Sequence, residues 1–351
     1  MQISNIDTNF AVQEHFTQDG FSFFDVRQAP FSVHGVFFED GKFRRMPESV
    51  AKTVSDGVHF LHTNTAGGRV RFSTDSEIIC IRVKTANEGK MPHFPFTGSI
   101  GFDLHTGARY VGTFIPPFDV KGGYESRLVI PEDLRDGTLR TYTLHMPLYA
   151  DVCQVLVGIA QEADLQAAPA YTYPVPVVYY GSSITQGGCA SRPGNAYENI
   201  VSYELDCDHI NLGFSGNAKG EDTMIDYLAG LDMSVFVCDY DHNAPSAEHL
   251  QNTHEKLFKA VRAKHPTLPV VFMTRPQLYL NEDEKSRLQI VQTTYENALA
   301  NADRNVYFIP GPQLLNDAVR NTALVDNCHP NDSGFVSMAN AVADVLRRIL
   351  K

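Results

Sequence analysis

A serine placed between an apolar run and a glycine pair is the first feature of this chain that could do chemistry. The stretch YYGSSITQGG, residues 179–188, contains Ser182 and Ser183. A serine hydroxyl is a poor nucleophile unless a base lies within hydrogen-bond reach and a third group orients that base. The same residues could instead form only a tight turn of small side chains. The reading therefore depends on whether a histidine and a carboxylate can reach this serine.

The stretch VDNCHPND supplies both groups, with Asp326 and His329 three residues apart. On a turn, this spacing lets the carboxylate accept a hydrogen bond from Nδ1–H of the imidazole, which leaves Nε2 free to take a proton from serine. Seen alone, an Asp-x-x-His pair is more typical of a capping loop. His242 is a second candidate base, and we prefer His329 because it has its own orienting carboxylate.

Two further stretches offer hydrogen-bond donors. Residues 211–220 read NLGFSGNAKG, and their glycines let a backbone N–H approach a ligand closely. Residues 238–246 read CDYDHNAPS, in which Asn243 offers a side-chain amide. A tetrahedral oxyanion needs two or three such preorganised donors. The chain therefore contains each part of a serine hydrolase site.

The elements that must position these residues divide the chain in two. Up to about residue 165, short runs rich in Val, Ile, Phe, Tyr and Thr alternate with turn residues, and no helical pattern longer than two turns competes. The expected strands are residues 68–74, 77–85, 98–106, 108–116, 139–147 and 153–160. In the first of them arginine alternates with Val70 and Phe72, which predicts one face on a core and one in water. This pattern favours a β-sandwich or jelly roll.

The pattern changes after the Ala- and Pro-rich residues 167–176, which we expect to be a linker. Continuous apolar strands now alternate with helical stretches. The expected strands are 175–180, 209–213, 234–240, 268–274 and 305–310, and the expected helices are 195–207, 223–229, 247–265, 282–302 and 332–350. Strands buried on both faces with a helix after each one predict a five-stranded, doubly wound parallel sheet.

We therefore predict a β-sandwich domain over residues 1–170 and an α/β domain over residues 171–351. In a doubly wound sheet, sites lie at the carboxyl ends of the strands. The serine turn and both donor stretches follow expected strands, and the Asp-x-x-His pair lies just before the last expected helix. The four stretches should meet at one edge of the sheet.

The order of these motifs resembles that of the SGNH (GDSL-type) hydrolases. It runs Gly-x-Ser, Asn-x-Gly-x-Ser-Gly, an Asn after the third strand, and Asp-x-x-His before the last helix. The resemblance covers about residues 176–350 and implies a flavodoxin-like catalytic domain. The amino half is similar to the sandwich that precedes this domain in one two-domain group, whose Gly-x-Asp-Leu-Tyr stretch is matched by GFDLHTG, with His105 in place of the tyrosine.

The resemblance also implies a role for each site residue. Ser183 is the expected nucleophile. Its own N–H, the N–H of Gly216 and the amide of Asn243 are the expected oxyanion hole. His329 is the expected general base and then acid, and Asp326 is expected to orient it.

The chain departs from the family pattern in two blocks. The usual Gly-Asp-Ser is Gly-Ser-Ser at residues 181–183, which leaves the nucleophile in place. The usual Gly-x-Asn-Asp is Asp-His-Asn-Ala at residues 241–244, so the role of Asn243 is less secure. The more common α/β-hydrolase fold is disfavoured because its Gly-x-Ser-x-Gly elbow would need a glycine where Thr185 stands.

Four other residues lie close in sequence to the candidate site. Arg192 and Arg275 are candidate substrate-binding residues, and for each a structural role at a turn or in an ion pair remains open. Cys189 and Cys328 are interpreted as packing thiols.

Composition limits the partners and the compartment. The net charge of −12 disfavours nucleic acid and anionic membranes, because phosphate binding needs clustered Lys and Arg. The chain has no signal-peptide-like start and no run of about 18 apolar residues. Its six scattered cysteines lack disulfide or metal spacing, so we expect a cytoplasmic protein with free thiols. No metal or organic cofactor is implied, and a homo-oligomer remains open.

We expect a serine esterase whose substrate is an O-acetylated sugar or oligosaccharide, the substrate following from the family resemblance. An acyltransferase and a glycan-binding protein without activity are the rivals. We also expect the amino half to pack against the hydrolase domain or a second subunit and to wall one side of the cleft, through loop aromatics such as Phe94, Phe96 and Phe118.

Overall fold

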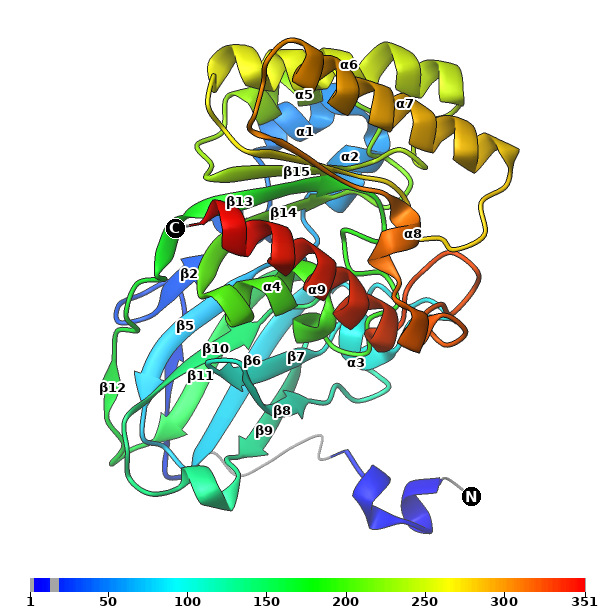
Figure 1. Cartoon of the computed structure of the whole chain (residues 1–351). Coiled ribbons are helices and arrows are strands. Elements are labelled where there is room, and N and C mark those ends of the chain that lie inside the picture. The colour runs from blue at the N-terminus through cyan, green and yellow to red at the C-terminus, as the bar shows by residue number, and fades with distance from the viewer. Residues whose placement is uncertain (1–2, 13–18, 351) are drawn as a thin grey trace.

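The computed structural model describes residues 3–12 and 19–350, and the carboxyl half of the chain contains the parallel sheet that positions the candidate site (Figure 1). Its strands, named in chain order, are β13 (Tyr173–Gly181), β14 (Cys207–Gly213), β15 (Val235–Asp239), β16 (Val270–Met273) and β17 (Val306–Ile309). They lie in the order β14-β13-β15-β16-β17 and all neighbouring pairs are parallel. This confirms the five-stranded doubly wound sheet.

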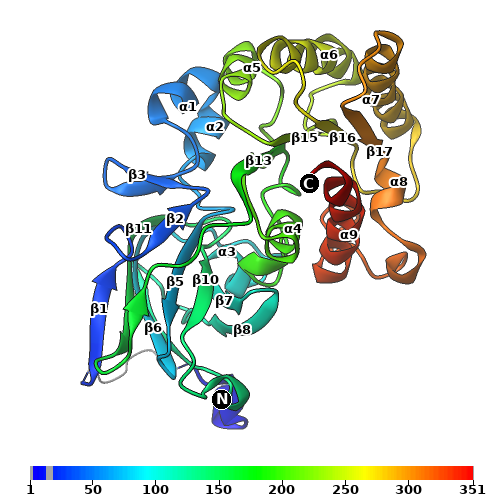
Figure 2. The ribbon, with the colours of Figure 1, turned by 60° about the vertical axis from the view of Figure 1, so that its left-hand side comes forward.

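Helices cover both faces of the sheet. They are α4 (Tyr197–Leu205), α5 (Asp222–Ala229), α6 (Ala247–Lys264), α7 (Glu282–Ala300), the short α8 (Gly311–Leu314) and α9 (Asp332–Ile349). Figure 2 shows α5, α6 and α7 on one side of the sheet and α4 and α9 on the other. Strand β13 is apolar on both faces because alternate residues meet different cores: Val178 and Tyr180 pack with α5 and α6, whereas Val177 and Tyr179 pack with α4 and α9.

The amino half is a sandwich of two antiparallel sheets. Its strands are β1 (Phe21–Asp25), β2 (Ser32–His34), β3 (Phe37–Glu39), β4 (Lys42–Arg44), β5 (Arg69–Thr74), β6 (Ile78–Asn87), β7 (Phe102–Thr106), β8 (Arg109–Phe114), β9 (Tyr124–Val129), β10 (Arg140–His145), β11 (Asp151–Ala160) and β12 (Leu165–Gln166). One sheet has the order β1-β11-β6-β9 and the other β12-β5-β10-β7-β8, with β2 also paired to β5, while β3 and β4 form a separate ribbon. The sheets share one apolar core.

The six strands expected from the sequence of the amino half are all present, and several other elements were not foreseen. The additional strands are β1, β2, β3, β4, β9 and β12. The additional helical segments, taken over the whole chain, are α1 (Glu48–Val54), α2 (Asp56–Leu61), α3 (Phe96–Ser99), α8 and the 3-10 turns Ile3–Asn5, Thr8–Phe10, Glu132–Leu134, Pro193–Asn195 and Asp317–Val319. Each of these helices is too short to give a helical period in the sequence.

Helices α1 and α2 belong to the amino half of the sequence but pack on the parallel sheet of the carboxyl half. Met46, Ala51, Val58 and Leu61 lie in the same apolar core as α5 and α6. Figure 2 shows α1 and α2 beside α5. The two halves of the chain therefore share a core and are not two bodies joined only by a linker.

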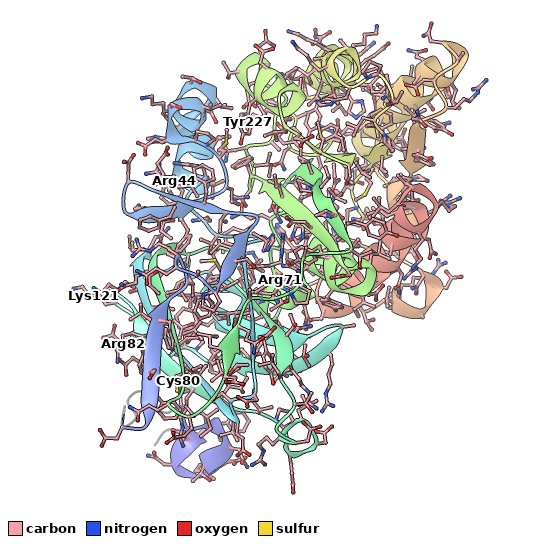
Figure 3. The ribbon with its side chains drawn as sticks, turned by 90° about the vertical axis from the view of Figure 1, so that its left-hand side faces the viewer. Arg44, Arg71, Cys80, Arg82, Lys121 and Tyr227 are labelled. Carbon is pink, nitrogen blue, oxygen red and sulfur yellow. The ribbon has the colours of Figure 1, made fainter. Side chains whose placement is uncertain are left out.

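The strand β5 shows why the halves pack so closely. Val70 and Phe72 face the sandwich core, as expected. The expectation that the opposite face meets water is wrong, because Arg69 and Arg71 are also buried. Arg69 donates to the carbonyl oxygen of His209 at 2.9 Å, and Figure 3 shows Arg71 where the two halves meet. The predicted alternation of side chains between the two faces of β5 is correct, but the second face meets the carboxyl half of the chain and not water.

The expected packing of the loop aromatics is confirmed for Phe94 alone. Phe94 is buried in the core under α4 and α9. Phe96 packs instead against the sandwich core, and Phe118 is 94% exposed. The predicted division at residues 170 and 171, and the jelly-roll topology of the sandwich, stay predictions. None of the helices in the described residues is long and apolar enough to cross a membrane.

Candidate active site

The candidate nucleophile lies in the turn that directly follows β13. Oγ of Ser183 lies 2.9 Å from Nε2 of His329. The neighbouring Ser182 is fully buried, and its Oγ accepts a hydrogen bond from the N–H of Ile184 at 3.1 Å. Of the two serines in the turn, Ser183 is therefore the one that meets the imidazole.

The loop before α9 holds the imidazole from its other side. Nδ1 of His329 lies 2.8 Å from Oδ2 of Asp326, whose Oδ1 accepts the N–H groups of His329 and Cys328 at 2.8 and 3.1 Å. Burial raises the pKa of Asp326, but these hydrogen bonds outweigh it and hold the pKa below its usual value. The carboxylate therefore stays ionised and fixes the imidazole with Nε2 toward the serine. The rival base His242 lies beside Asp241, with Nδ1 3.4 Å from its Oδ1.

The three expected oxyanion donors belong to the serine turn and to the two donor stretches that follow β14 and β15. Among the described residues, no acceptor is recorded for the N–H of Ser183, the N–H of Gly216 or the side-chain amide of Asn243. The side-chain Oδ1 of Asn243 accepts the N–H of Ala218 at 3.4 Å, which joins the two donor loops. Gly216 has φ of 68°, a left-handed value that favours glycine, and a Cβ at this position would meet no atom within 4 Å. The oxyanion role of these groups stays a prediction.

Arg275 holds the histidine loop against the end of β16. Its guanidinium donates to the carbonyl oxygen of Asn327 at 2.8 Å and to Glu284 at 2.7 Å. Its backbone N–H donates to Asp241 at 3.1 Å. The structure thus places Arg275 next to the loop that carries His329. Contact with substrate stays a prediction.

Gln186 ties the serine turn to an oxyanion loop and to the amino half. Its Oε1 accepts the N–H of Ser215 at 3.0 Å, and its Nε2 donates to Asn64 at 3.1 Å and to the carbonyl oxygen of Leu148 at 3.2 Å. Asn64 is in turn held by Asp151 at 2.9 Å. Because Gln186 is fully buried, this network fixes the loop that precedes Gly216.

Arg192 lies at the contact between the two halves of the chain. Its guanidinium nitrogen lies 2.6 Å from Oδ2 of Asp103 and 2.8 Å from Nε2 of His105. The same Oδ2 of Asp103 accepts the N–H of Gly194 at 3.0 Å. Oδ1 of Asp103 lies 2.8 Å from Nδ1 of His145. Burial raises the pKa of Asp103, but these basic partners more than compensate and hold it well below its usual value. The Gly-x-Asp-Leu stretch therefore anchors the segment after the serine turn. A substrate contact by Arg192 stays a prediction.

Residues of the amino half also reach the site. The hydroxyl of Tyr149 lies 3.4 Å from the carbonyl oxygen of Ser183. The ring centroids of His93 and His329 are 5.8 Å apart. On the hydrolase side, a Cβ on Gly188 would lie 3.3 Å from Cδ2 of His329, so this glycine allows the serine turn and the histidine loop to approach closely.

Sequence reasoning did not find Gln186, Asn64, Tyr149 or His93. Gln186 lies within the serine stretch, and an uncharged amide buried in a turn gives no periodic signal. Asn64, Tyr149 and His93 are distant in sequence, and only the packing of the two halves brings them to the serine.

Two family models match this chain. Residues 175–347 match the GDSL-like lipase/acylhydrolase family, and residues 21–165 match the domain described as the N-terminus of SGNH hydrolase-type esterases. No curated protein matches the sequence.

Solved structures share the whole two-part architecture. A Bacteroides ovatus protein assigned provisionally as a GDSL-like lipase is 26% identical, with a TM-score of 0.81 over 94% of this chain and 98% of its own. The salicylyl-acyltransferase SsfX3 from a tetracycline biosynthetic pathway is 16% identical, with a TM-score of 0.76 over 95% and 99%. A family two carbohydrate esterase from Cellvibrio japonicus is 10% identical, with a TM-score of 0.61 over 94% and 98%. The arrangement of sandwich and parallel sheet is thus common to all of them.

Proposed function

Because this chain belongs to the SGNH (GDSL-type) hydrolase family, we propose that it is a serine esterase that forms an acyl-enzyme on Ser183. The observation that carries the proposal is the continuous hydrogen-bonded chain from Ser183 through His329 to Asp326, with distances of 2.9 and 2.8 Å. This arrangement supplies a nucleophile, its base and an orienting carboxylate together.

In the first half of the reaction, Nε2 of His329 takes the proton of Ser183 as Oγ attacks the ester carbonyl carbon. The negative charge that develops on the carbonyl oxygen is stabilised by the free donors of Ser183, Gly216 and Asn243. The C–O bond to the alcohol then breaks, and the imidazolium returns its proton to the leaving alcohol. Asp326 stabilises the imidazolium throughout.

In the second half, water replaces the alcohol. His329 takes a proton from water, whose oxygen attacks the acyl carbon. Collapse of the second tetrahedral intermediate releases the carboxylic acid and returns the proton to Oγ of Ser183. Atoms and protons balance without any other reactant.

We propose an acetyl ester of a sugar or oligosaccharide as the substrate. The residues around the serine are small (Gly181, Ser182, Gly187 and Gly188), which suits a short acyl group. The fold is shared with the Cellvibrio japonicus carbohydrate esterase and with an acetyl xylan esterase from Butyrivibrio proteoclasticus, which is 13% identical with a TM-score of 0.57 over 93% of this chain and 98% of its own. Both support a carbohydrate ester as the first class to test.

An acyltransferase is the second candidate, and the similarity to SsfX3 over nearly the whole chain favours it. The two candidates differ only in the second half, where an alcohol acceptor would replace water. Adding increasing concentrations of a sugar alcohol and measuring the ratio of hydrolysis to transfer separates them.

The proposal is tested by acetate release from a panel of acetylated sugars, with long-chain esters as controls. We expect the highest kcat/KM on a sugar acetate, and a fall in kcat of several orders of magnitude in Ser183→Ala with the fold intact. Ser182→Ala should retain most of the activity. Hydrolysis by Ser183→Ala at the wild-type rate would show that another group is the nucleophile.

A further inference from the structure

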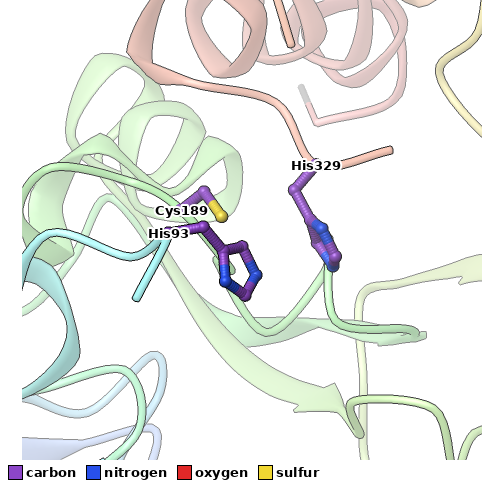
Figure 4. Close-up of side chains that lie close together, drawn as sticks. All are labelled: His93, Cys189 and His329. Carbon is purple, nitrogen blue, oxygen red and sulfur yellow. The ribbon is translucent and has the colours of Figure 1, made fainter. Parts of the chain in front are cut away.

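Three metal-binding side chains gather at the candidate site, each from a different segment of the chain. His93 comes from the loop between β6 and α3, Cys189 from the serine turn, and His329 from the loop before α9. Their ligand atoms all lie within 4.8 Å of one another. Figure 4 shows the Cys189 sulfur and the two imidazole rings facing a common space.

We propose that His93, Cys189 and His329 form an inhibitory site for a zinc-like divalent cation. The inhibition rests on the proposed function, because the metal would occupy the nitrogen of His329 that must accept the serine proton. The binding itself does not depend on that function.

The ligand set selects the class of metal. Two imidazoles and a thiolate suit Zn²⁺ and similar ions, whereas Mg²⁺ and Ca²⁺ require oxygen ligands. Zinc bonds of about 2.0–2.3 Å put tetrahedral ligands about 3.5 Å apart. The three ligand atoms lie within 4.8 Å of one another, so they must come closer together to bind zinc, and the side chain of His93 is 44% exposed on its loop. Three protein ligands leave the fourth position to water.

The site also has the support that metal-bound histidine needs. Asp326 already holds Nδ1 of His329, which leaves Nε2 as the metal ligand in the carboxylate–histidine arrangement common to zinc sites. Nε2 of His93 lies 3.7 Å from the same carboxylate oxygen. One carboxylate therefore faces both imidazoles and would offset the charge of the cation.

Cys189 is held in an unusual conformation for its type. Its backbone has φ of 75°, a left-handed value that costs energy for any residue except glycine, and its side chain is almost fully buried. Metal ligation requires a thiolate and neutral imidazoles, so the thiol of Cys189 would release its proton to solvent as the metal binds.

A second cluster, formed by Asp103, His105 and His145, is already occupied by a positive charge. The guanidinium of Arg192 lies 2.6 Å from Asp103 and 2.8 Å from His105. The guanidinium of Arg192 would repel a cation from this cluster, so it does not compete with the cluster at the serine.

The test measures zinc binding by calorimetry in the full-length Ser183→Ala variant, which keeps all three ligands, and zinc inhibition of ester hydrolysis in the wild type. We expect one zinc to bind, inhibition that a chelator reverses, and no effect of Mg²⁺. Cys189→Ser and His93→Gln should each raise the zinc Kd at least tenfold, since even loss of an outer partner costs about that much. Cys153→Ser and His59→Gln are the matched controls and should bind as the parent.

Several results would overturn the proposal. They are no zinc binding to the Ser183→Ala variant, an unchanged Kd in both Cys189→Ser and His93→Gln, or activity that bound zinc leaves unchanged or raises. If the wild type hydrolyses no ester, the proposed function fails, and the calorimetry still decides whether the metal site exists.

Discussion

The serine turn and the histidine loop are held in different ways. The serine turn is buried, with Ser182, Thr185 and Gln186 all at 0% exposure, and its contacts come from both halves of the chain. Thr185 donates to Asp239 in the hydrolase sheet at 3.2 Å, whereas Gln186 donates to Asn64 in the amino half. The nucleophile is therefore positioned by the whole molecule.

The histidine loop is more exposed and is held mainly by the hydrolase half. The Asp326 side chain is 32% exposed. The loop is closed by a single bridge between Leu324 and Pro330 and is fixed from outside by Arg275 and Gln277, which donate to the same carbonyl oxygen. We therefore expect substitutions in the amino half to affect catalysis by displacing Ser183 and the loop of Gly216. Substitutions around Arg275 should instead affect it by displacing the base His329.

The largest effect should come from removing the amino half. A fragment beginning at Tyr171 lacks Met46, Ala51 and Val58 from the core under α5, and it leaves Gln186 without its Asn64 partner. We expect loss of a cooperatively folded state and of activity, measured by near-ultraviolet circular dichroism, size-exclusion chromatography and ester hydrolysis.

The control for this deletion is a chain that begins at Asp19, which keeps both sheets of the sandwich and loses the 3-10 turns Ile3–Asn5 and Thr8–Phe10, neither of which has a buried residue. It should fold and react as the full chain does. If the Tyr171 fragment folded stably with full kcat/KM, the amino half would be only a tethered neighbour.

A smaller effect is expected when Gln186 alone is changed. Gln186→Leu removes the three hydrogen bonds of a buried side chain, and with them a contact that holds the loop of Ser215 and Gly216. We expect kcat to fall about ten- to a hundredfold with little change in KM, because loss of an oxyanion donor itself costs about 10²–10³. Steady-state kinetics with the exposed Gln313→Leu as control tests this. A rise in KM at constant kcat would instead make Gln186 a substrate-binding residue.

The two arginines predicted to bind substrate provide the next comparison. Arg275→Met releases Asn327 beside the base, so we expect kcat to fall about tenfold and the pH profile of kcat/KM to change shape. Arg192→Met removes a partner of buried Asp103, so we expect lower stability to urea and nearly unchanged kcat. A raised KM as the main effect in either variant would support the substrate contact.

The smallest effect on activity is expected at Glu198, which supports the serine turn from α4. Its Oε1 accepts from Asn211, whose amide also donates to the carbonyl oxygen of Thr185. Burial raises the pKa of Glu198 to about 8 from 4.5. Between these values the unfolded chain releases a proton that the folded chain keeps, so stability falls as the pH rises from about 4.5 to about 8.

Glu198→Gln keeps the acceptor and removes this titration. Urea unfolding at pH 5 and pH 8 should show the variant gaining stability relative to the wild type at the higher pH, on the order of a few kcal/mol, with kcat nearly unchanged. An equal stability difference at both pH values would show that Glu198 is ionised in the folded protein.

The sequence was sufficient for the parts of the molecule that follow local rules. All five parallel strands and their long helices follow from apolar runs and helical spacing. Asp326 and His329 are three residues apart, so their contact is nearly local, and the order of the motifs put Ser183 at the end of the first parallel strand. The distance of 2.9 Å between Oγ of Ser183 and Nε2 of His329 agrees with that expectation.

The parts that could not be predicted depend on contacts between distant segments. The arginines of β5 look solvent-facing because strand alternation cannot show that a second domain covers that face. Helices α1 and α2 are too short to give a period, and nothing local indicates that they complete the hydrolase core. The positioning role of Gln186 depends on its contact with Asn64, and the proposed metal-binding role of Cys189 depends on His93. Both partners belong to the amino half, which is distant in sequence.

The central claim is that Ser183 is the nucleophile and His329 its base. It is tested directly by reaction with an organophosphonate that labels activated serines, followed by intact-protein and peptide mass spectrometry to locate the adduct. We expect a single adduct, on the peptide that contains Ser183 and assigned to that residue by fragmentation, with no labelling in Ser183→Ala and very slow labelling in His329→Ala. An adduct on Ser182 or another residue, or an unlabelled enzyme that still turns over substrate in the presence of the reagent, would contradict it.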